Sequence, residues 1–241
     1  MGTRAETHFS RRVPPRDCPE LMDGACSYEE FRACLRSLEQ VNRWLLGYRP
    51  TLAWLARLPR GRREPVHILD VGSGGGDLLR QIAKWARRRG IAVQLTGIDL
   101  NPHATRAAAE FTPRDRGIAW VTGDALAHRP ETPVDIVVSS LTAHHLEDEE
   151  IVMLLRWMEV TAVRGWFLND LERSERSSRI FGRLARILGW HRFVRHDGPV
   201  SFRRAFRKED WARLLAGAGI SPEAATVQRW RPGRLCVGRW K

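Results

Sequence analysis

A glycine-rich turn and two aspartates further along the chain are the residues whose types and spacing most clearly suggest chemistry. The turn, Asp70-Val71-Gly72-Ser73-Gly74-Gly75-Gly76, follows a short apolar run and precedes a helical pattern. Glycines in a strand-to-helix turn let the backbone approach a nucleotide-like ligand closely. Asp99 and Asp124 follow the next two apolar runs, where one carboxylate can accept both ribose hydroxyls and the other an adenine amino group. Each of these acids could instead cap a helix or hold a turn.

The spacing of the turn favours a cofactor that carries no phosphate. The dinucleotide fingerprint G-x-G-x-x-G fits Gly72 and Gly74, but Asp77 stands where a third glycine is required. A carboxylate there, together with Asp70, would repel a pyrophosphate, whereas S-adenosylmethionine carries a sulfonium and an ammonium group. We therefore predict S-adenosylmethionine as the cofactor.

Two histidine motifs could move a proton. His144 and His145 follow the apolar run 134–140, and the carboxyl end of a parallel strand is where a ligand binds. An imidazole titrates near neutral pH and can take the proton of a phenol. His196, beside Asp197, is the third candidate, because a carboxylate can orient an imidazole. At most one of the adjacent pair is expected to be catalytic, and the alternative for all three is a capping or turn role.

These residues need a scaffold, and the alternation of short apolar runs with helical patterns is typical of parallel βαβ units. We expect strands at 66–71, 93–98, 118–121, 134–140 and 163–169, helices at 77–89, 102–110, 148–160, 173–188 and 208–216, and a final hairpin of 225–230 with 235–240. A capping box at Ser27 and Glu30 begins an earlier helix that ends at Gly47, and a second helix covers 51–58. Residues 1–60 should thus form an arm and a helical cap, and residues 61–241 the cofactor-binding domain.

Several of these motifs resemble those of a known family. Ile68 to Asp77, Gly97 to Asn101 and Gly123 to Ala125 look like successive motifs of class I S-adenosylmethionine-dependent methyltransferases, a resemblance that runs from about residue 20 to the C-terminus. It implies an α/β, Rossmann-like fold with a seven-stranded, mostly parallel sheet, a C-terminal antiparallel hairpin and a helical cap. Segments 20–23, 143–146, 169–174, 196–198 and 201–206 are similar to a bacterial subgroup found in small-molecule, polyketide or quinone pathways.

The resemblance also implies roles for individual residues. Those expected to bind the cofactor are Asp70, Gly72, Ser73, Gly74, Gly76, Asp99, Leu100, Asp124, Ala125 and Ser140. Those expected to contact the substrate are Asn169, Asp170 and Arg173, and Cys34, Trp44, Phe181 and Trp190 could line the acceptor pocket or belong to the core. No metal is expected, because metal-dependent catechol methyltransferases need a further carboxylate where this chain has Ser139-Ser140.

The activity that follows is methyl transfer to a small-molecule acceptor, most simply to an oxygen of a phenolic, polyketide-like or quinone-like metabolite, with a carbon or a nitrogen as the alternative. The net charge of +12 raises the alternative of an RNA methyltransferase. Against it, the basic excess is arginine scattered along the chain, and the D/N/S-P-P-Y/F/W turn of amino-methylating enzymes is missing at 140–144. A non-catalytic subunit that binds S-adenosylmethionine is the third alternative.

Composition also limits where the chain works and in what form. The four cysteines include no CxxC pair, so reduced thiols in the cytoplasm are expected. No run of about 18 apolar residues indicates a membrane span. We expect a monomer or a homodimer.

Overall fold

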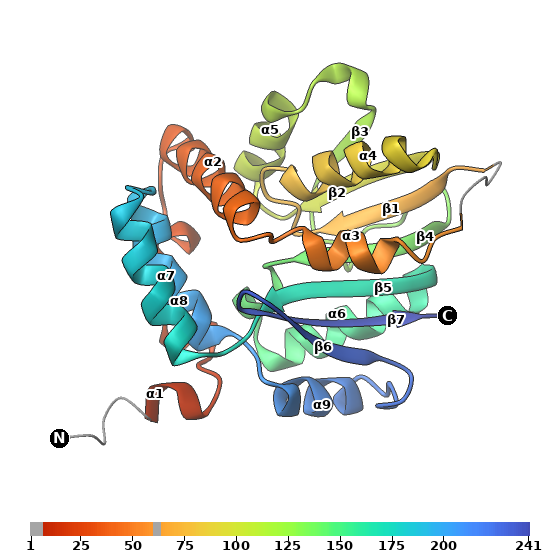
Figure 1. The fold of residues 1–241 in the computed structure, drawn as a ribbon. Helices are drawn as coiled ribbons and strands as arrows, with labels where there is room; N and C mark the ends of the chain where they lie inside the picture. Colours follow the sequence, from red (N-terminus) through yellow and green to blue (C-terminus); the bar gives the residue numbers. More distant parts are fainter. Residues whose placement is uncertain (1–6, 60–63) are drawn as a thin grey trace.

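A computed structural model describes residues 7–59 and 64–241, which are arranged around one seven-stranded sheet (Figure 1). The strand order is β3-β2-β1-β4-β5-β7-β6. Neighbours from β3 to β5 pair in parallel, whereas β7 is antiparallel to both of its neighbours. The strands are β1 (Val66–Val71), β2 (Val93–Asp99), β3 (Ile118–Thr122), β4 (Val134–Ser140), β5 (Ala162–Leu171), β6 (Thr226–Trp230) and β7 (Arg234–Trp240). The predicted fold class is confirmed.

Helices cover both faces of the sheet, which explains why its central strands are largely buried along their length. All six residues of β1 are buried. The helices α3 (Arg49–Leu55) and α4 (Asp77–Arg89) lie on one face, and α6 (Asp148–Thr161) and α9 (Lys208–Gly217) on the other (Figure 1). The helix α5 (Pro102–Phe111) packs beside β2 and β3. No helix in the described ranges combines the length and apolarity that crossing a membrane requires.

A helical cap stands over the carboxyl ends of the strands (Figure 1). It consists of α2 (Tyr28–Trp44), α7 (Glu175–Ile187) and α8 (Arg192–Arg204). Their buried contact surface is apolar and contains Cys34, Val41, Ala185, Phe193 and Val194. The cap therefore combines a segment before the sheet with one inserted after β5.

The inserted segment leaves the sheet and returns to it at one point. Glu172 and Phe206 form an isolated parallel bridge, in which the Arg173 N–H donates to the Phe206 carbonyl over 2.8 Å and the Phe206 N–H to the Leu171 carbonyl over 3.3 Å. The helices α7 and α8 are thus an excursion with its two ends tied together.

The helix α8 is the main element that the sequence patterns do not predict. Residues 196–198 look like a turn, yet they lie inside this helix together with Pro199. Only glycine fits at position 198, since a Cβ there would lie 2.0 Å from Cε1 of Phe181. Without a side chain at this position α7 and α8 can touch, and this packing outweighs the helix-breaking tendency of the Gly-Pro pair.

The N-terminal arm is ordered by its contacts. It contains α1 (Thr7–Ser10) and the short 3₁₀ turns η1 (Pro15–Asp17) and η2 (Leu21–Asp23). Arg12 donates to Asp148 Oδ1 over 2.6 Å at the start of α6 and to the Arg204 carbonyl over 2.8 Å at the end of α8. These contacts carry residues 20–23 to the carboxyl ends of the strands.

Candidate active site

One cavity of about 1080 Å³ lies beneath the cap. The glycine turn after β1 and the ends of β2 and β3 form one side of it, and the loop after β4 forms the other. Helices α2, α7 and α8 supply the roof. The cavity thus occupies the crevice at the carboxyl ends of parallel strands where open α/β sheets bind ligands.

The glycine turn is built for close approach of a ligand. Gly72 and Gly74 adopt φ values of 68° and 51°, in the left-handed region that glycine tolerates. Asp99 fastens the turn, since its Oδ2 accepts from the Gly74 N–H over 2.8 Å and its Oδ1 from the Asn101 N–H over 2.9 Å. Burial raises the pKa of Asp99, and these two hydrogen bonds offset the rise only in part.

Most of the predicted cofactor residues line the cavity, namely Gly72, Ser73, Gly74, Asp99, Leu100, Asp124, Ala125 and Ser140. Leu100 is 75% exposed in a structure without ligand. Asp124 Oδ1 accepts from the Leu126 N–H over 2.9 Å, which holds the loop after β3 at the cavity. Residues that follow four different strands therefore line one cavity.

Asp70 and Gly76 lie outside the lining, contrary to the prediction that they contact the cofactor. Asp70 is 2% exposed, and burial together with the charges of Asp77 and Asp99 raises its pKa well above the ordinary range. Gly76 has φ 73°, and a Cβ there would lie 2.2 Å from Trp120 Cη2. Both residues therefore support the glycine turn on the side that faces away from the cavity lining.

The loop after β4 presents the two adjacent histidines. It begins at Leu141, whose φ of 58° is unusual for a residue with a side chain, and continues as η4 (Ala143–His145). His144 is buried, with its Nδ1 at 2.7 Å from Asp170 Oδ1. His145 is half-buried, with its Nδ1 at 3.0 Å from Asp23 Oδ1. Each imidazole is therefore oriented by a carboxylate on its Nδ1 side.

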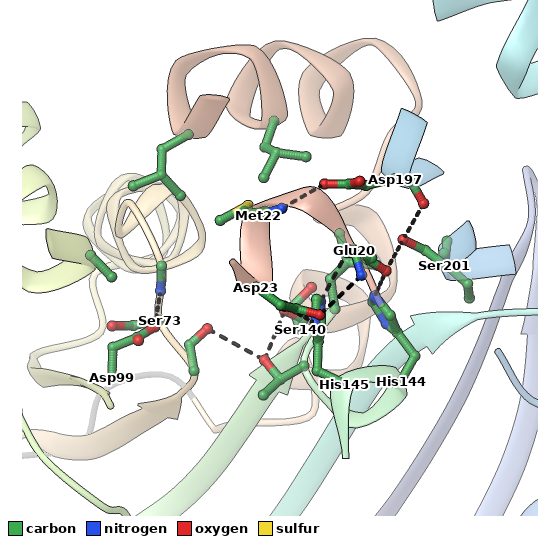
Figure 2. A pocket seen from close by; sticks show the side chains of 18 of the residues that line it. Glu20, Met22, Asp23, Ser73, Asp99, Ser140, His144, His145, Asp197 and Ser201 are labelled. Atoms are coloured by element: carbon green, nitrogen blue, oxygen red, sulfur yellow. Dashed lines mark hydrogen bonds and ion pairs between the residues drawn. The ribbon is translucent and has the colours of Figure 1, made fainter. Parts of the chain in front are cut away.

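The other ring nitrogens of both histidines face one buried carboxylate, as Figure 2 shows. His144 Nε2 lies 3.9 Å from Glu20 Oε1, and His145 Nε2 lies 3.8 Å from Glu20 Oε2. Glu20 Oε1 also accepts from the Ser201 hydroxyl over 2.7 Å and pairs with Arg204 at 2.9 Å. We call Glu20, Asp23, His144 and His145 the polar corner of the cavity.

The charges of the polar corner shift one another's pKa values. Burial alone would lower the pKa of His145, but the hydrogen bond to Asp23 and the charge of Glu20 raise it above its ordinary value. Burial would raise the pKa of Asp23, yet His145 and Arg204 bring it well below the usual range. Asp23 is consequently a carboxylate throughout the physiological pH range.

The three predicted substrate residues lie behind the cavity wall. The Asn169 amide donates to the Gly47 carbonyl over 2.8 Å, which fixes the chain between α2 and α3. Asp170 orients His144, and Arg173 forms a buried 2.6 Å ion pair with Asp210. In this structure these side chains therefore hold neighbouring elements together or orient His144.

The remaining predictions divide in the same way. His196 is outside the lining, with its side chain 52% exposed and its Nδ1 2.8 Å from Asp197 Oδ1. Cys34 and Phe181 line the cavity, whereas Trp44 is 66% exposed on the surface and Trp190 is buried in the cap. Exposure of His196 leaves it without the neighbours that a catalytic base at this cavity would need.

Glu20 and Asp23 are the site residues that sequence reasoning missed. They belong to a segment expected to be an arm, although the resemblance already included residues 20–23. The available signal was a pair of acidic residues three positions apart. Arg204, 1% exposed, was equally hidden among scattered arginines.

Comparisons with known proteins agree with this geometry. Residues 68–165 match a family described as a methyltransferase domain. Trans-aconitate 2-methyltransferase of Mycobacterium tuberculosis is 34% identical over 109 residues, 45% of this chain and 36% of that protein. The protein of the same name from Streptomyces avermitilis is 29% identical over 162 residues, 63% of this chain and 58% of the relative. The chain spans 36–60% of the length of the curated relatives considered.

Solved structures show the same architecture. Human N-acetylserotonin methyltransferase in complex with S-adenosylmethionine has a TM-score of 0.60 at 18% identity, with 89% of this chain and 56% of that chain covered. The plantazolicin methyltransferase BpumL in complex with S-adenosylhomocysteine has a TM-score of 0.60 at 16% identity, with 88% and 95% covered. The chain has the class I methyltransferase fold. Its sheet carries a region similar to known methyltransferase domains in the part that forms the glycine turn and the histidine loop.

Proposed function

We propose that this protein transfers a methyl group from S-adenosylmethionine to an oxygen of a small, uncharged, largely apolar acceptor such as a phenol or a hydroxyquinone. The observation that carries the proposal is the continuity of one cavity, with the glycine turn and Asp99 at one end and the polar corner at the other. A cofactor bound at the turn and an acceptor under the cap would then meet without crossing solvent.

The glycine-turn end fits S-adenosylmethionine. Gly72 and Gly74 offer a backbone surface without side chains, and in our proposal Asp99 accepts from the ribose hydroxyls and Asp124 from the adenine amino group. Asp77 lies at the same end, where a cationic group is favoured and a pyrophosphate is not. S-adenosylmethionine supplies an electrophilic methyl group on a sulfonium.

The cap end fits an apolar acceptor. The side chains of Leu38, Ile180, Phe181, Leu184 and Phe202 line it and can bury an aromatic ring. Holding a ring there would align its oxygen with the methyl group, and such alignment alone contributes about 7–11 kcal/mol to catalysis.

The charge of the cavity argues against a tricarboxylate acceptor such as trans-aconitate. At the cap end the lining contains the acids Glu20, Asp23, Glu150 and Asp197. Among the described lining residues Arg234 is the only guanidinium, and it donates to Asn42 Oδ1 over 2.9 Å. A trianion would be repelled, so we infer an acceptor class different from that named for the relatives.

The polar corner is where the acceptor hydroxyl would be held and ionised. The acceptor O–H gives its proton to a histidine imidazole of the polar corner, the oxygen lone pair forms a bond to the methyl carbon, and the electrons of the broken carbon–sulfur bond remain on sulfur. His145, half-buried and open to the cavity, and the neighbouring His144 are the groups at the reacting oxygen.

Binding of the cofactor product is the first test. Calorimetry with S-adenosylhomocysteine should show micromolar binding by the wild type, strong loss in Asp99→Ala, and no binding of NADH. Glu131→Ala, a loop variant away from the cavity lining, is the matched control and should bind as the wild type does.

Methyl transfer is the second test. With methyl-labelled S-adenosylmethionine, a panel of naphthols and hydroxyquinones should be labelled, and trans-aconitate and transfer RNA should not. Labelling of RNA, or of trans-aconitate in preference to the phenols, would contradict the proposal, as would a failure to bind S-adenosylhomocysteine.

A further inference from the structure

We infer that Glu20, His144 and His145 form a binding site for one divalent transition-metal ion at the cap end of the cavity. The carboxylate belongs to Glu20, the residue directly before η2, and the two imidazoles belong to the loop after β4. These two segments are distant in sequence. The sequence-based expectation of no metal considered an all-oxygen set and did not include Glu20. The role of the ion toward the acceptor, discussed below, rests on the proposed function, whereas the site itself does not.

The distances within the cluster match a site that can close on one ion. One ligand atom from each residue lies within 4.8 Å of the others. The N–O separations of 3.9 and 3.8 Å are too long for hydrogen bonds. They are shorter than the roughly 4.0–4.3 Å that separates two ligands on opposite sides of one ion. The two N–O pairs would close by about 0.5 Å, and the third pair of ligand atoms, which lie within 4.8 Å of each other, by up to about 1.4 Å, to reach the roughly 3.4 Å separation of a tetrahedral arrangement.

Both histidines are oriented as metal ligands usually are. A ligating imidazole commonly donates its other ring N–H to a carboxylate, which fixes the tautomer and directs the lone pair of the second nitrogen at the metal. Asp170 accepts from His144 Nδ1 at 2.7 Å, and Asp23 accepts from His145 Nδ1 at 3.0 Å. In that tautomer the Nε2 lone pairs of both rings face Glu20.

Three electron-rich groups facing one another need a cation. With neutral imidazoles, the carboxylates of Glu20, Asp23 and Asp170 are opposed by Arg204, at 2.9 Å from Glu20 Oε1, and by Arg234, whose charge acts on Asp170. The carboxylates remain in excess, and a cation at the Nε2 atoms would reduce that excess. Arg204 contacts Oε1, whereas Glu20 Oε2 is the oxygen that faces His145 Nε2.

The donor set selects the class of metal. Two imidazole nitrogens and one carboxylate oxygen suit Fe²⁺, Mn²⁺, Co²⁺ or Zn²⁺ and leave open coordination positions. Mg²⁺ and Ca²⁺ prefer oxygen ligands and are disfavoured. Since the cluster lines the cavity, the open positions would face the acceptor. With both Nε2 atoms bound to the ion, the ion would lower the pKa of the acceptor hydroxyl in place of proton transfer to a histidine.

The test is a titration of the full-length chain with Co²⁺ after removal of metals by a chelator. The wild type should take up one ion per chain, with the visible absorption of cobalt bound to imidazole. His144→Ala and Glu20→Gln should lose this ion, and the latter preserves the shape of the side chain. Asp170→Asn should weaken binding about 10–100-fold, because it acts through His144. His196→Ala removes a histidine that also contacts a carboxylate but lies outside the cluster, and it should bind Co²⁺ as the wild type does.

S-adenosylhomocysteine binding, measured on every variant, separates failure of the metal site from failure of the fold or of the proposed function. Each variant should keep it, because Asp99 and the glycine turn are untouched. Absence of stoichiometric Co²⁺ uptake by the wild type would overturn the inference. Co²⁺ uptake by Glu20→Gln and His144→Ala equal to that of the wild type would overturn it as well. So would a loss of uptake in His196→Ala as large as in those two variants.

Discussion

The guanidinium of Arg204 donates to Asp23 Oδ2 over 2.8 Å, although the two residues lie 181 positions apart in the sequence. The same guanidinium pairs with Glu20 and is 1% exposed. One arginine thus joins the N-terminal arm to the end of α8 and neutralises part of the polar corner.

Arg204→Ala should therefore lower the free energy of unfolding by about 3–5 kcal/mol, because it leaves two carboxylates without their buried cation. Denaturant titration of the metal-free protein measures the effect. The matched control is Arg213→Ala, since this arginine has a 60% exposed side chain and pairs with Asp148 at 2.7 Å. It should cost less than about 1 kcal/mol. Equal effects of the two substitutions would refute the importance of the Arg204 pairs.

Gly76→Ala should destabilise the protein more than Gly90→Ala. Both glycines have positive φ, 73° and 65°, so either alanine bears a conformational cost of about 1–2 kcal/mol. Only at Gly76 would the new Cβ collide, 2.2 Å from Trp120, whereas nothing lies within 4 Å at Gly90. Overpacking should add about 1–3 kcal/mol at Gly76. Thermal unfolding of the two variants compares the costs directly, and indistinguishable melting would contradict the packing seen at Trp120.

The affinity for S-adenosylhomocysteine should fall in acid at a higher pH than an ordinary aspartate would give. Burial raises the pKa of Asp99, so the unliganded protein holds this carboxyl protonated to a higher pH than the usual value of about 4. Ribose hydroxyls favour the ionised form, and binding in acid must then release a proton. Affinity therefore decreases as the pH drops through the raised pKa and is constant above it.

Calorimetry in buffers of different ionisation enthalpy detects that proton. Asp99→Asn is the control, since its weaker binding should lose this pH dependence. A wild-type affinity that stays constant down to the ordinary aspartate range would argue against the role of Asp99.

Alkylation of the native protein should modify Cys18 much faster than the buried Cys34 and Cys236. Burial raises the pKa values of Cys34 and Cys236 to about 12, so almost no thiolate forms at pH 8. Iodoacetamide should modify Cys18, which is partly exposed, and spare the two buried thiols until denaturant is added. Peptide mass spectrometry gives the pattern, and rapid labelling of Cys236 in the native protein would contradict its burial beside β5.

The sequence predicts well those site residues that depend on local structure. The strand, the glycine turn and the following helix fall within residues 66–89, and parallel strands bring their carboxyl ends together, so Asp99 and Asp124 could be assigned without coordinates. The histidine loop follows from the same rule. The family match at residues 68–165 covers this local region.

The polar corner depends on contacts that no local pattern contains. Ser201 reaches Glu20 across 181 positions, and His145 reaches Asp23 across 122. The helix that carries Ser201 contains Gly198 and Pro199, which favour a turn when considered alone. For the same reason the sequence alone does not show that tertiary packing turns the side chains of Asn169 and Arg173 toward Gly47 and Asp210.

The tie between Glu172 and Phe206 has a consequence for how such a protein can change over evolution. The segment that contains α7 and α8 leaves and re-enters the sheet at adjacent backbone positions. This whole segment can therefore be lengthened, shortened or replaced with little disturbance to strand pairing. The glycine turn, which lies before this segment, would be inherited intact. Acceptor preference can thus diverge among descendants while cofactor use stays fixed. Residues 174–205 are, for the same reason, the segment to exchange in a chimera that is meant to accept another molecule.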